Sequence, residues 1–274
     1  LSMEEGKIIA EARGEVAKTT RYVEFAAGDA RRMTGITSES EIPGTFAMTI
    51  WRPHGVVGLI TPWNFPVCIP LWKIAPAIAA GNTVVLKPAP ETPATAHLIG
   101  KLIQEAGIPD GVVNIVHGDV APATAIIEHP DVTAISFTGS TEVGRIIEAQ
   151  CGALHKPIQC ELGGKNPLLI FSDADLDLAA GACAKGAFGS TGQRCTATSR
   201  AIVMDDVADA FVAKVLEHAA AVRAGHPLDE ATTMGPSVSE KQLAQVLKYM
   251  EIGAGEGGLR CLSLIHISEP TRPS

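Results

Sequence analysis

The sequence lacks the residue spacings that mark disulfide frameworks and metal centres. Its six cysteines include no Cys-x-x-Cys pair, and its eight histidines include no His-x-x-x-His pair. The first absence favours a reducing compartment, and the second leaves a metal site without support. We therefore expect unpaired thiols and no bound metal.

Long apolar runs and a basic surplus are also missing. No uninterrupted apolar run approaches the ~18 residues that a membrane-spanning helix needs, and no basic segment followed by an apolar one opens the chain. The net charge is −8 and the pI is about 5.5, which argues against nucleic acid as the main partner. These absences predict a cytoplasmic protein that contacts neither membranes nor nucleic acids.

What is present is a regular alternation of strand and helix patterns in a chain that is 46% hydrophobic. Strand-like runs are followed by helix-like segments, which predicts parallel strands joined by crossover helices. The predicted order is strand 83–86, helix 92–106, strand 112–116, helix 122–128, strand 132–137 and helix 141–151. The fold class is therefore α/β, a Rossmann-like parallel sheet with helices on both faces. A partial second α/β domain follows, with strands at 167–171 and 200–204, helices at 176–188, 207–223 and 240–252, and a boundary near Gly163-Gly164.

Cys195 stands apart from the other cysteines in the predicted domains. Cys68, Cys151, Cys160 and Cys183 lie in apolar patterns and are interpreted as small core residues, whereas Cys195 lies in the polar run Gly-Gln-Arg-Cys-Thr. A thiolate in such a run can attack a carbonyl, and the neighbouring Arg194 can favour the thiolate.

Two further side chains suit acyl chemistry. Glu161 precedes two glycines and can act as the general base for a water molecule, or it can be a structural carboxylate that caps the turn. Asn64, in the run Thr-Pro-Trp-Asn-Phe-Pro, can donate its amide to an oxyanion, or it can simply form an Asx turn.

Two positions at strand ends suit an anionic ligand. Lys87 follows an apolar strand, and Gly139-Ser140 lies between a strand and a helix whose N-terminal amides can hold phosphate. A solvated lysine and an ordinary capping serine are the alternatives, and no Gly-x-Gly-x-x-Gly motif lies near the first strands.

These runs, with Val84–Pro88 and Phe137–Ser140, resemble the NAD(P)-dependent aldehyde dehydrogenase superfamily in order and spacing, from about Glu4 to about Arg260. The resemblance implies a Cys195 nucleophile, a Glu161 base and an Asn64 oxyanion donor. It implies a small-molecule aldehyde substrate and NAD or NADP as cofactor. The residues that it assigns to the cofactor are Thr61, Trp63, Lys87, Pro90, Gly139, Ser140 and Leu162, and those that it assigns to the aldehyde channel are Phe65 and Trp72.

The runs Glu4–Lys7 and Ser190–Thr196 resemble the branch that oxidises 2-oxoglutarate semialdehyde, succinate semialdehyde and related substrates. One position departs from many NAD-preferring relatives, which carry a glutamate where this chain has Pro90, with Glu91 one residue later. The choice between NAD and NADP therefore stays open.

The resemblance also implies a division of the chain into domains. Residues 1–162 are expected to form the NAD(P)-binding domain, with an oligomerisation arm at 35–53, and residues 163–261 part of the catalytic domain. Residues 262–274 resemble a translated sequencing adapter, so we expect a truncated piece of a homodimeric or homotetrameric parent, weakly active or inactive by itself. A cysteine esterase or acyl transferase without redox function, and a non-catalytic fragment, are the alternatives.

Overall fold

The computed structural model describes residues 1–256, and these form two compact units. The sheet unit is Gly14–Leu162, and the Cys195 unit is Leu1–Arg13 with the described part of Gly163–Ser274. The division falls inside the helix α2 (Ile9–Ala30). The predicted adapter-like tail at 262–274 lies outside the described residues.

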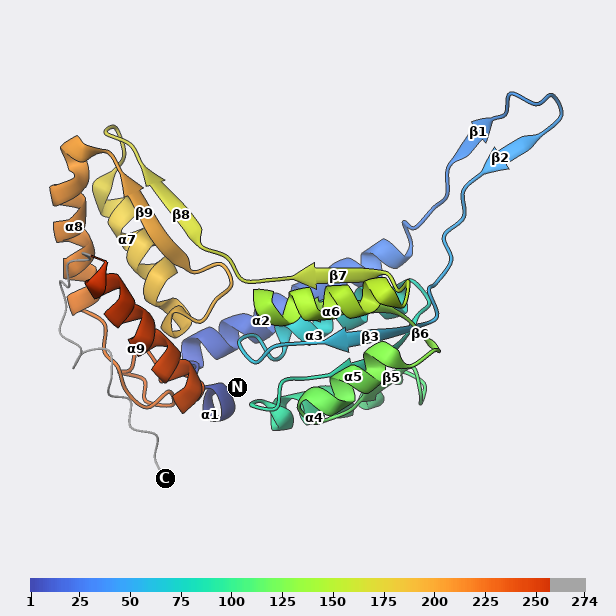
Figure 1. Ribbon diagram of the computed structural model, residues 1–274, viewed down its shortest axis with the longest axis horizontal. Coiled ribbons are helices and arrows are strands. Elements are labelled where there is room, and N and C mark those ends of the chain that lie inside the picture. Colours follow the sequence, from blue (N-terminus) through green and yellow to red (C-terminus); the bar gives the residue numbers. More distant parts are fainter. Residues whose placement is uncertain (257–274) are drawn as a thin grey trace. The chain divides into compact units, whose positions relative to one another are not determined.

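The sheet unit is built around five parallel strands in the order β5-β4-β3-β6-β7, with helices on both faces (Figure 1). The predicted α/β class and Rossmann-like sheet are confirmed. The strands are β3 (Val56–Ile60), β4 (Thr83–Lys87), β5 (Val113–Ile115), β6 (Val132–Thr138) and β7 (Ile158–Glu161). The helices that connect them are α3 (Cys68–Ala79), α4 (Pro93–Glu105), α5 (Val120–Glu128) and α6 (Thr141–Ala153).

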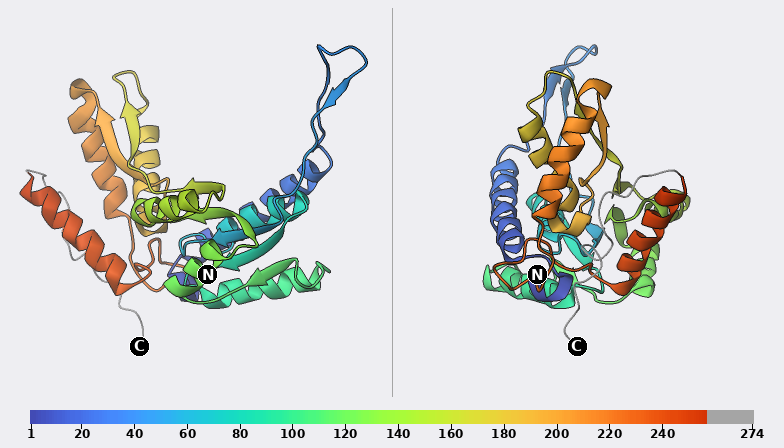
Figure 2. Two further views of the ribbon diagram at one scale, coloured as in Figure 1. Left: turned by 45° about the vertical axis from the view of Figure 1, so that its right-hand side comes forward. Right: turned by 90° about the vertical axis from the view of Figure 1, so that its left-hand side faces the viewer.

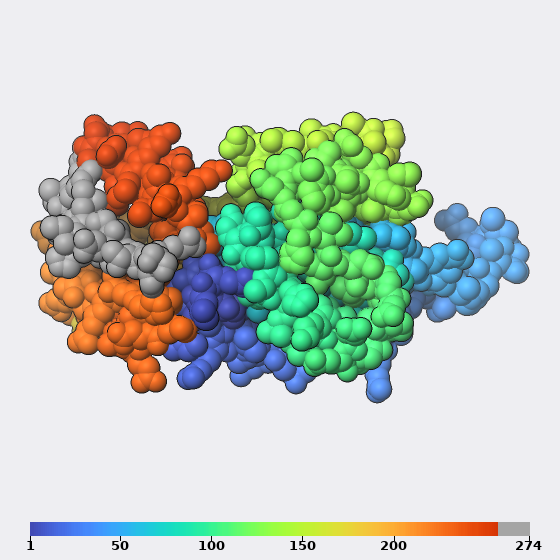
Figure 3. Space-filling view, turned by 90° about the horizontal axis from the view of Figure 1, so that it is seen from below, coloured from blue at the N-terminus to red at the C-terminus, as the bar shows by residue number. Residues whose placement is uncertain are grey.

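Alternating residues of β3 divide the core of this unit into two layers. Val57 and Leu59 pack with Ile74 of α3 in one cluster, whereas Ile60 packs with Ile127 of α5 in the other. Such alternation follows from the period of two along a strand. Ile103 of α4 joins the first cluster, so α4 and α5 lie on opposite faces of the sheet. Both helices belong to the green part of the surface that Figure 3 shows from below.

Gly58 in β3 explains how α5 comes so close to the sheet. A Cβ atom at this position would lie 2.4 Å from Cγ2 of Ile126 and 2.7 Å from Cδ1 of Ile135. Only glycine leaves room for the isoleucine side chains that close the core on this side.

A two-stranded arm projects from the sheet unit, as Figure 2 shows at left. It consists of β1 (Thr37–Glu39) and β2 (Phe46–Met48), which pair antiparallel. Its apolar side chains are largely exposed, among them Phe46 (71%) and Trp51 (74%). Both strands lie within residues 35–53, the segment in which the resemblance implies an arm.

The Cys195 unit pairs the parallel strands β8 (Asn166–Ile170) and β9 (Thr198–Val203) and packs α7 (Leu176–Phe188) and α8 (Asp205–Ala220) against them. The short α1 (Ser2–Glu5) and α9 (Glu240–Gly255) complete its described helices, and a 3₁₀ turn, η1 (Gly189–Gly192), follows α7. The elements predicted at 167–171, 176–188, 200–204, 207–223 and 240–252 are all found, with boundaries within a few residues.

The first thirteen residues group with the Cys195 unit, although the sequence pattern placed them in the first domain. Ile9 N donates a 3.1 Å hydrogen bond to Pro227 O. A Cβ atom on Gly235 would lie 1.8 Å from Gly6 O, so the backbones touch there. Both contacts join segments far apart in sequence, which local patterns do not reveal. Within residues 1–256, no helix has the length and apolar character required to cross a membrane.

Candidate active site

The carboxyl edge of the sheet holds most of the predicted cofactor residues. β3 and β6 are neighbours, yet the chain runs from β3 outward to β4 and β5 and from β6 outward to β7. Ligands of open α/β sheets bind outside the carboxyl ends of strands at such a reversal. Here the residues concerned are Thr61 after β3 and Thr138, Gly139 and Ser140 at the end of β6.

Two buried hydroxyl groups at this edge are without hydrogen-bond partners among the described residues, namely Thr61 Oγ1 and Thr138 Oγ1. A buried hydroxyl that lacks a partner is costly, so such groups point to a missing ligand or water. Gly139 follows directly, where a Cβ atom would lie 2.4 Å from Cζ of Phe137. These features fit a dinucleotide that approaches the backbone closely.

Ser140 caps α6, as predicted, because its Oγ accepts a 3.3 Å hydrogen bond from Val143 N. The first-turn amides and the dipole of a thirteen-residue helix favour an anion at this end. The residues present therefore fit the pyrophosphate of a dinucleotide.

Lys87 is the last residue of β4 and is buried, with 6% of its surface exposed. Burial lowers the pKa of its ammonium, and the nearby Asp119 and Glu91 oppose that effect. The lysine is therefore held inside the edge rather than solvated. Pro90 is exposed two residues before the buried Thr92.

Glu161 ends β7 and is the register partner of Thr138. Its backbone oxygen accepts a 3.1 Å hydrogen bond from Gly139 N, and its Oε1 accepts a 2.7 Å bond from Gln159 Nε2. The side chain is exposed. An exposed carboxylate oriented by one amide suits a base that meets a water molecule, and Glu161 lies on the same edge as the predicted cofactor residues.

Sequence reasoning missed a buried lysine beside Glu161. Lys73 of α3 is 7% exposed, and its Nζ donates to Ser136 Oγ (2.6 Å) and to Gln159 Oε1 (3.2 Å). Burial lowers its pKa to about 8, with Glu161 and then Cys160 acting in the opposite direction. A lone lysine in an otherwise apolar helix was the available signal.

Lys73 and Glu161 line one cavity of about 670 Å³ in the sheet unit, between α3 and the strands β3, β6 and β7. Trp72 borders the same cavity and packs edge-on against Tyr22 of α2, with ring centroids 5.8 Å apart. The position of Trp72 is thus partly explained by packing.

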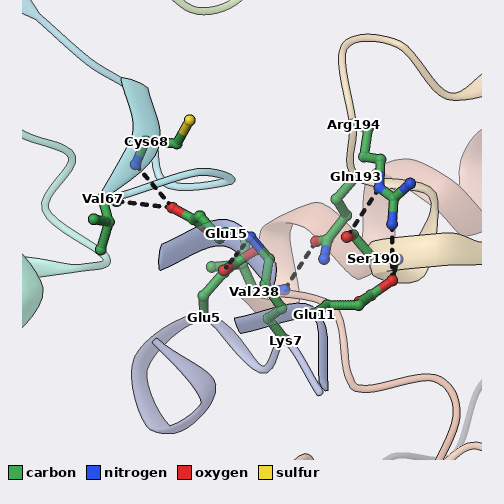
Figure 4. A network of polar contacts seen from close by, with 10 residues as sticks. All are labelled: Glu5, Lys7, Glu11, Glu15, Val67, Cys68, Ser190, Gln193, Arg194 and Val238. Atoms are coloured by element: carbon green, nitrogen blue, oxygen red, sulfur yellow. Dashed lines mark hydrogen bonds and ion pairs between the residues drawn. The ribbon is translucent and has the colours of Figure 1, made fainter. Parts of the chain in front are cut away.

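Asn64 lies in the half-buried loop between β3 and α3, beside Trp63 and Phe65. Glu15 fixes the end of this loop, because its Oε1 accepts hydrogen bonds from Val67 N (2.9 Å) and Cys68 N (3.0 Å) (Figure 4). These amides lie at the start of α3, so the carboxylate caps the helix from a distant segment.

Leu162, the residue after β7, packs against α6. A Cβ atom on Gly144 of α6 would lie 2.4 Å from Cδ2 of Leu162. The leucine side chain therefore occupies the space that this glycine leaves, and it packs on the cluster beneath α5 and α6.

Cys195 belongs to the Cys195 unit, in the loop after η1, and its side chain is exposed. Cys68, Cys151 and Cys183 are buried and Cys160 is half-buried, as the core interpretation predicted for the first three. Burial, followed by a hydrogen bond with Glu148, raises the pKa of Cys160 to about 11. Among the cysteines of residues 1–256, Cys195 is therefore the accessible thiol.

The Cys195 loop is fixed by named contacts within its own unit. Asn166 Nδ2 donates to Cys195 O (2.8 Å) and Ala197 O (3.1 Å). The guanidinium of Arg194 is engaged by Glu11 Oε1 at 2.8 Å, so its partner in the structure is a carboxylate. Sequence reasoning found Arg194 but not Glu11 or Asn166.

The structure thus brings Thr61, Lys87, Thr138, Gly139 and Glu161 to one edge of one sheet and places the exposed thiol in the second unit. Within the described residues, no group of three or more His, Cys, Asp or Glu side chains is arranged to hold a metal ion.

Comparison with known proteins gives concordant matches. Residues 1–263 match the sequence model of the aldehyde dehydrogenase family. Alpha-ketoglutaric semialdehyde dehydrogenase of Bacillus subtilis is 45% identical over 93% of this chain and 52% of its own length. Alpha-ketoglutarate semialdehyde dehydrogenase of Haloferax volcanii is 44% identical over 94% of this chain and 53% of its own length.

Two solved structures show the same fold. An NAD-dependent aldehyde dehydrogenase from Sinorhizobium meliloti has a TM-score of 0.91 at 40% identity, covering 93% of this chain and 51% of that one. An E. coli NADP-dependent enzyme has a TM-score of 0.91 at 37% identity, covering 93% and 53%. The chain therefore spans about half the length of the relatives it matches.

Proposed function

The chain belongs to the aldehyde dehydrogenase family, and on that premise we propose that the protein containing it oxidises an aldehyde to a carboxylic acid with NAD or NADP. The observation that carries the proposal is the row of residues at the carboxyl edge of the sheet. Lys87 pairs in register with Ile60, which pairs with Phe137, and the next residue, Thr138, pairs with Glu161. The proposed cofactor residues and the candidate base thus lie at the same edge of one parallel sheet.

We propose these roles for the chain's own residues. The Cys195 thiolate attacks the aldehyde carbon to form a thiohemiacetal, and the amide of Asn64 with the backbone N–H of Cys195 stabilises its oxyanion. Loss of a hydride from the thiohemiacetal leaves a thioester on Cys195, and NAD(P)⁺ held by Lys87, Gly139 and Ser140 would be the hydride acceptor. Glu161 then takes a proton from water, which cleaves the thioester to the free acid and restores the thiol.

The remaining cofactor and channel residues are part of the same proposal. Thr61 and Thr138 offer their buried hydroxyls to the cofactor, and Trp63, Pro90 and Leu162 border it. Phe65 and Trp72 border the aldehyde. The nearness of Glu91 to Lys87 supports acceptance of either dinucleotide, since a carboxylate there weakens the attraction of a 2′-phosphate without removing the lysine.

We assign the dinucleotide to the sheet unit and the beginning of the catalytic domain to the Cys195 unit. The exposed apolar arm β1–β2 is proposed to pair with another subunit in a homodimeric or homotetrameric parent, because edge strands present backbone N–H and C=O groups to which another strand can bind. The five unpaired cysteines within residues 1–256 support a reducing compartment such as the cytoplasm.

A semialdehyde such as 2-oxoglutarate semialdehyde is the proposed substrate class, supported by the names of the Bacillus and Haloferax relatives. The test is to express the full-length protein from its complete reading frame and to assay several aldehydes with NAD and NADP in parallel. Formation of NAD(P)H together with the acid supports the proposal. Ester cleavage that needs no dinucleotide, with no aldehyde oxidation, would favour a cysteine esterase instead.

A further inference from the structure

We infer that Glu11 and Arg194 are positioning residues, whose ion pair braces the loop that presents Cys195, and that Arg194 is not the counterion of the Cys195 thiolate. The inference rests on the proposed function, in which Cys195 is the nucleophile. It concerns contacts within the Cys195 unit alone.

The loop needs a brace because its backbone is unusual. Ser190 (φ 50°), Thr191 (φ 57°) and Gly192 (φ 67°) are successive residues in the left-handed region. Residues with a Cβ atom seldom adopt that conformation, and two in succession persist only where surrounding contacts enforce it. The turn places Cys195 three residues later, after the chain has changed direction.

Glu11 and Arg194 close a ring of hydrogen bonds around the first of these residues (Figure 4). Oε1 of Glu11 accepts from Ser190 N at 2.8 Å and from Nη2 of Arg194 at 2.8 Å. Nε of Arg194 donates to Ser190 Oγ at 3.0 Å. The backbone of Ser190 is thus held by Glu11 and its side chain by Arg194, the two members of the ion pair.

Other hydrogen bonds hold the residues that follow Ser190 in the loop. Thr191 Oγ1 donates to Gly235 O at 2.9 Å, and Gln193 Oε1 accepts from Val238 N at 3.0 Å. Asn166 Nδ2 holds Cys195 O at 2.8 Å. Ser190 is the point of the loop whose support comes from charged side chains.

Space around the guanidinium is also limited. A Cβ atom on Gly189 would lie 2.8 Å from Nη2 and 3.1 Å from Cζ of Arg194. The ion pair is only partly accessible, with 25% of the arginine and 22% of the glutamate side chain exposed. Arg194 therefore acts on Cys195 through the loop that it holds.

The test compares Glu11→Ala, Arg194→Ala and the double variant of the 274-residue chain with the matched control Glu24→Ala, an exposed glutamate of the same helix. Hydrogen exchange of residues 189–196 and iodoacetamide alkylation of Cys195 between pH 6 and 10 are measured by peptide mass spectrometry. We expect exchange to rise at least about tenfold in both single variants, with no further rise in the double variant. The pH midpoint of alkylation should move by less than about 0.3.

A counterion role predicts the reverse pattern. A rise of about one unit in the alkylation midpoint of Arg194→Ala, with unchanged loop exchange, would overturn the inference. So would wild-type exchange in both single variants. If an alanine variant does not fold, Glu11→Gln and Arg194→Gln carry the same test, since each removes the charge of one member of the ion pair while keeping a polar side chain.

Activity of the full-length protein separates this inference from the proposed function. Glu11→Ala should lower kcat about 10- to 100-fold with KM values within about threefold, because a misplaced nucleophile slows chemistry more than binding. Activity that survives Cys195→Ser defeats the proposed function, while the exchange and alkylation results still decide whether the brace exists.

Discussion

Nζ of Lys73 lies 2.6 Å from Oγ of Ser136, in a buried position beside the candidate base Glu161. An ammonium with so little water around it is easier to deprotonate, which is why its pKa falls to about 8. The same network reaches Glu161 through Gln159. A cation and a carboxylate thus share one hydrogen-bonded set of side chains in the sheet unit.

The first prediction concerns stability in alkali. Below pH 8 Lys73 is charged in both folded and unfolded chains; between about pH 8 and 10.5 only the unfolded chain keeps the proton. The contribution of Lys73 to the free energy of unfolding should therefore rise with pH, by about 3 kcal/mol at 1.36 kcal/mol per pH unit. Lys73→Met should lose this rise in urea unfolding at pH 7.5, 9 and 10.

The matched control is Lys101→Met, a change at an exposed lysine of α4. Cys160, with a pKa raised to about 11, acts in the opposite direction near pH 10, so the difference between wild type and Lys73→Met is the quantity to compare. If the free energies of unfolding of wild type and Lys73→Met changed in parallel with pH, the pKa of Lys73 would not be lowered.

The second prediction concerns the nucleophile in the full-length protein. Cys195→Ser should lower aldehyde oxidation at least about a thousandfold, because a serine hydroxyl with no dedicated base is a poor nucleophile. Dinucleotide affinity should stay within about twofold, since the proposed cofactor residues belong to the sheet unit. Fluorescence titration with NADH and steady-state rates measure the two effects. Loss of both together would indicate misfolding rather than a missing nucleophile.

The third prediction concerns the base. Glu161→Gln should slow turnover by about 10²- to 10⁴-fold while leaving the first chemical step intact. A burst of NAD(P)H close to one equivalent per active site should appear in stopped flow, and an acyl adduct on the Cys195 peptide should appear by mass spectrometry. Glu105→Gln, a change at an exposed glutamate of α4, is the control. Unchanged steady-state rates in Glu161→Gln would show that Glu161 is a structural carboxylate and not the base.

The fourth prediction concerns Asn64. As an oxyanion donor its loss in Asn64→Ala should raise the barrier by about 2.7–4 kcal/mol, a fall in kcat of roughly 100- to 1000-fold. KM for the aldehyde should change much less, because the oxyanion exists only after attack. A fall of less than about tenfold would favour a turn-forming role, and the thermal midpoint of the variant would then drop instead.

Much of the fold follows from local patterns. The parallel sheet was predicted because strand-like runs alternate with helices long enough for crossovers, and the strands predicted at 83–86 and 132–137 each end one residue before β4 and β6 do. Cys195 and Glu161 were predicted as well, since each is a reactive side chain in a polar, glycine-rich setting that core packing does not require. The strand-to-helix junction at Gly139-Ser140 was predicted from local patterns, and Ser140 does cap the helix, whereas its assignment to the cofactor came from the family resemblance.

The partners of these residues could not be predicted from local patterns. Glu11 lies 183 positions from Arg194, and Gln159 lies 86 positions from Lys73. Pairings over such distances are selected by the path of the chain rather than by neighbouring residues. The grouping of Leu1–Arg13 with the Cys195 unit has the same origin.

The sequence by itself determined the chemistry available to this protein: a thiol, a carboxylate, an amide and a lysine in runs that specify strands, turns and helix starts. Tertiary structure alone decided which groups share an environment. Strand order and register placed Thr138 opposite Glu161. Burial lowered the pKa of Lys73. Arg194 forms an ion pair with Glu11, a carboxylate distant in the sequence. Desolvation and through-space electrostatics depend on separation in three dimensions, and separation along the chain carries little information about it.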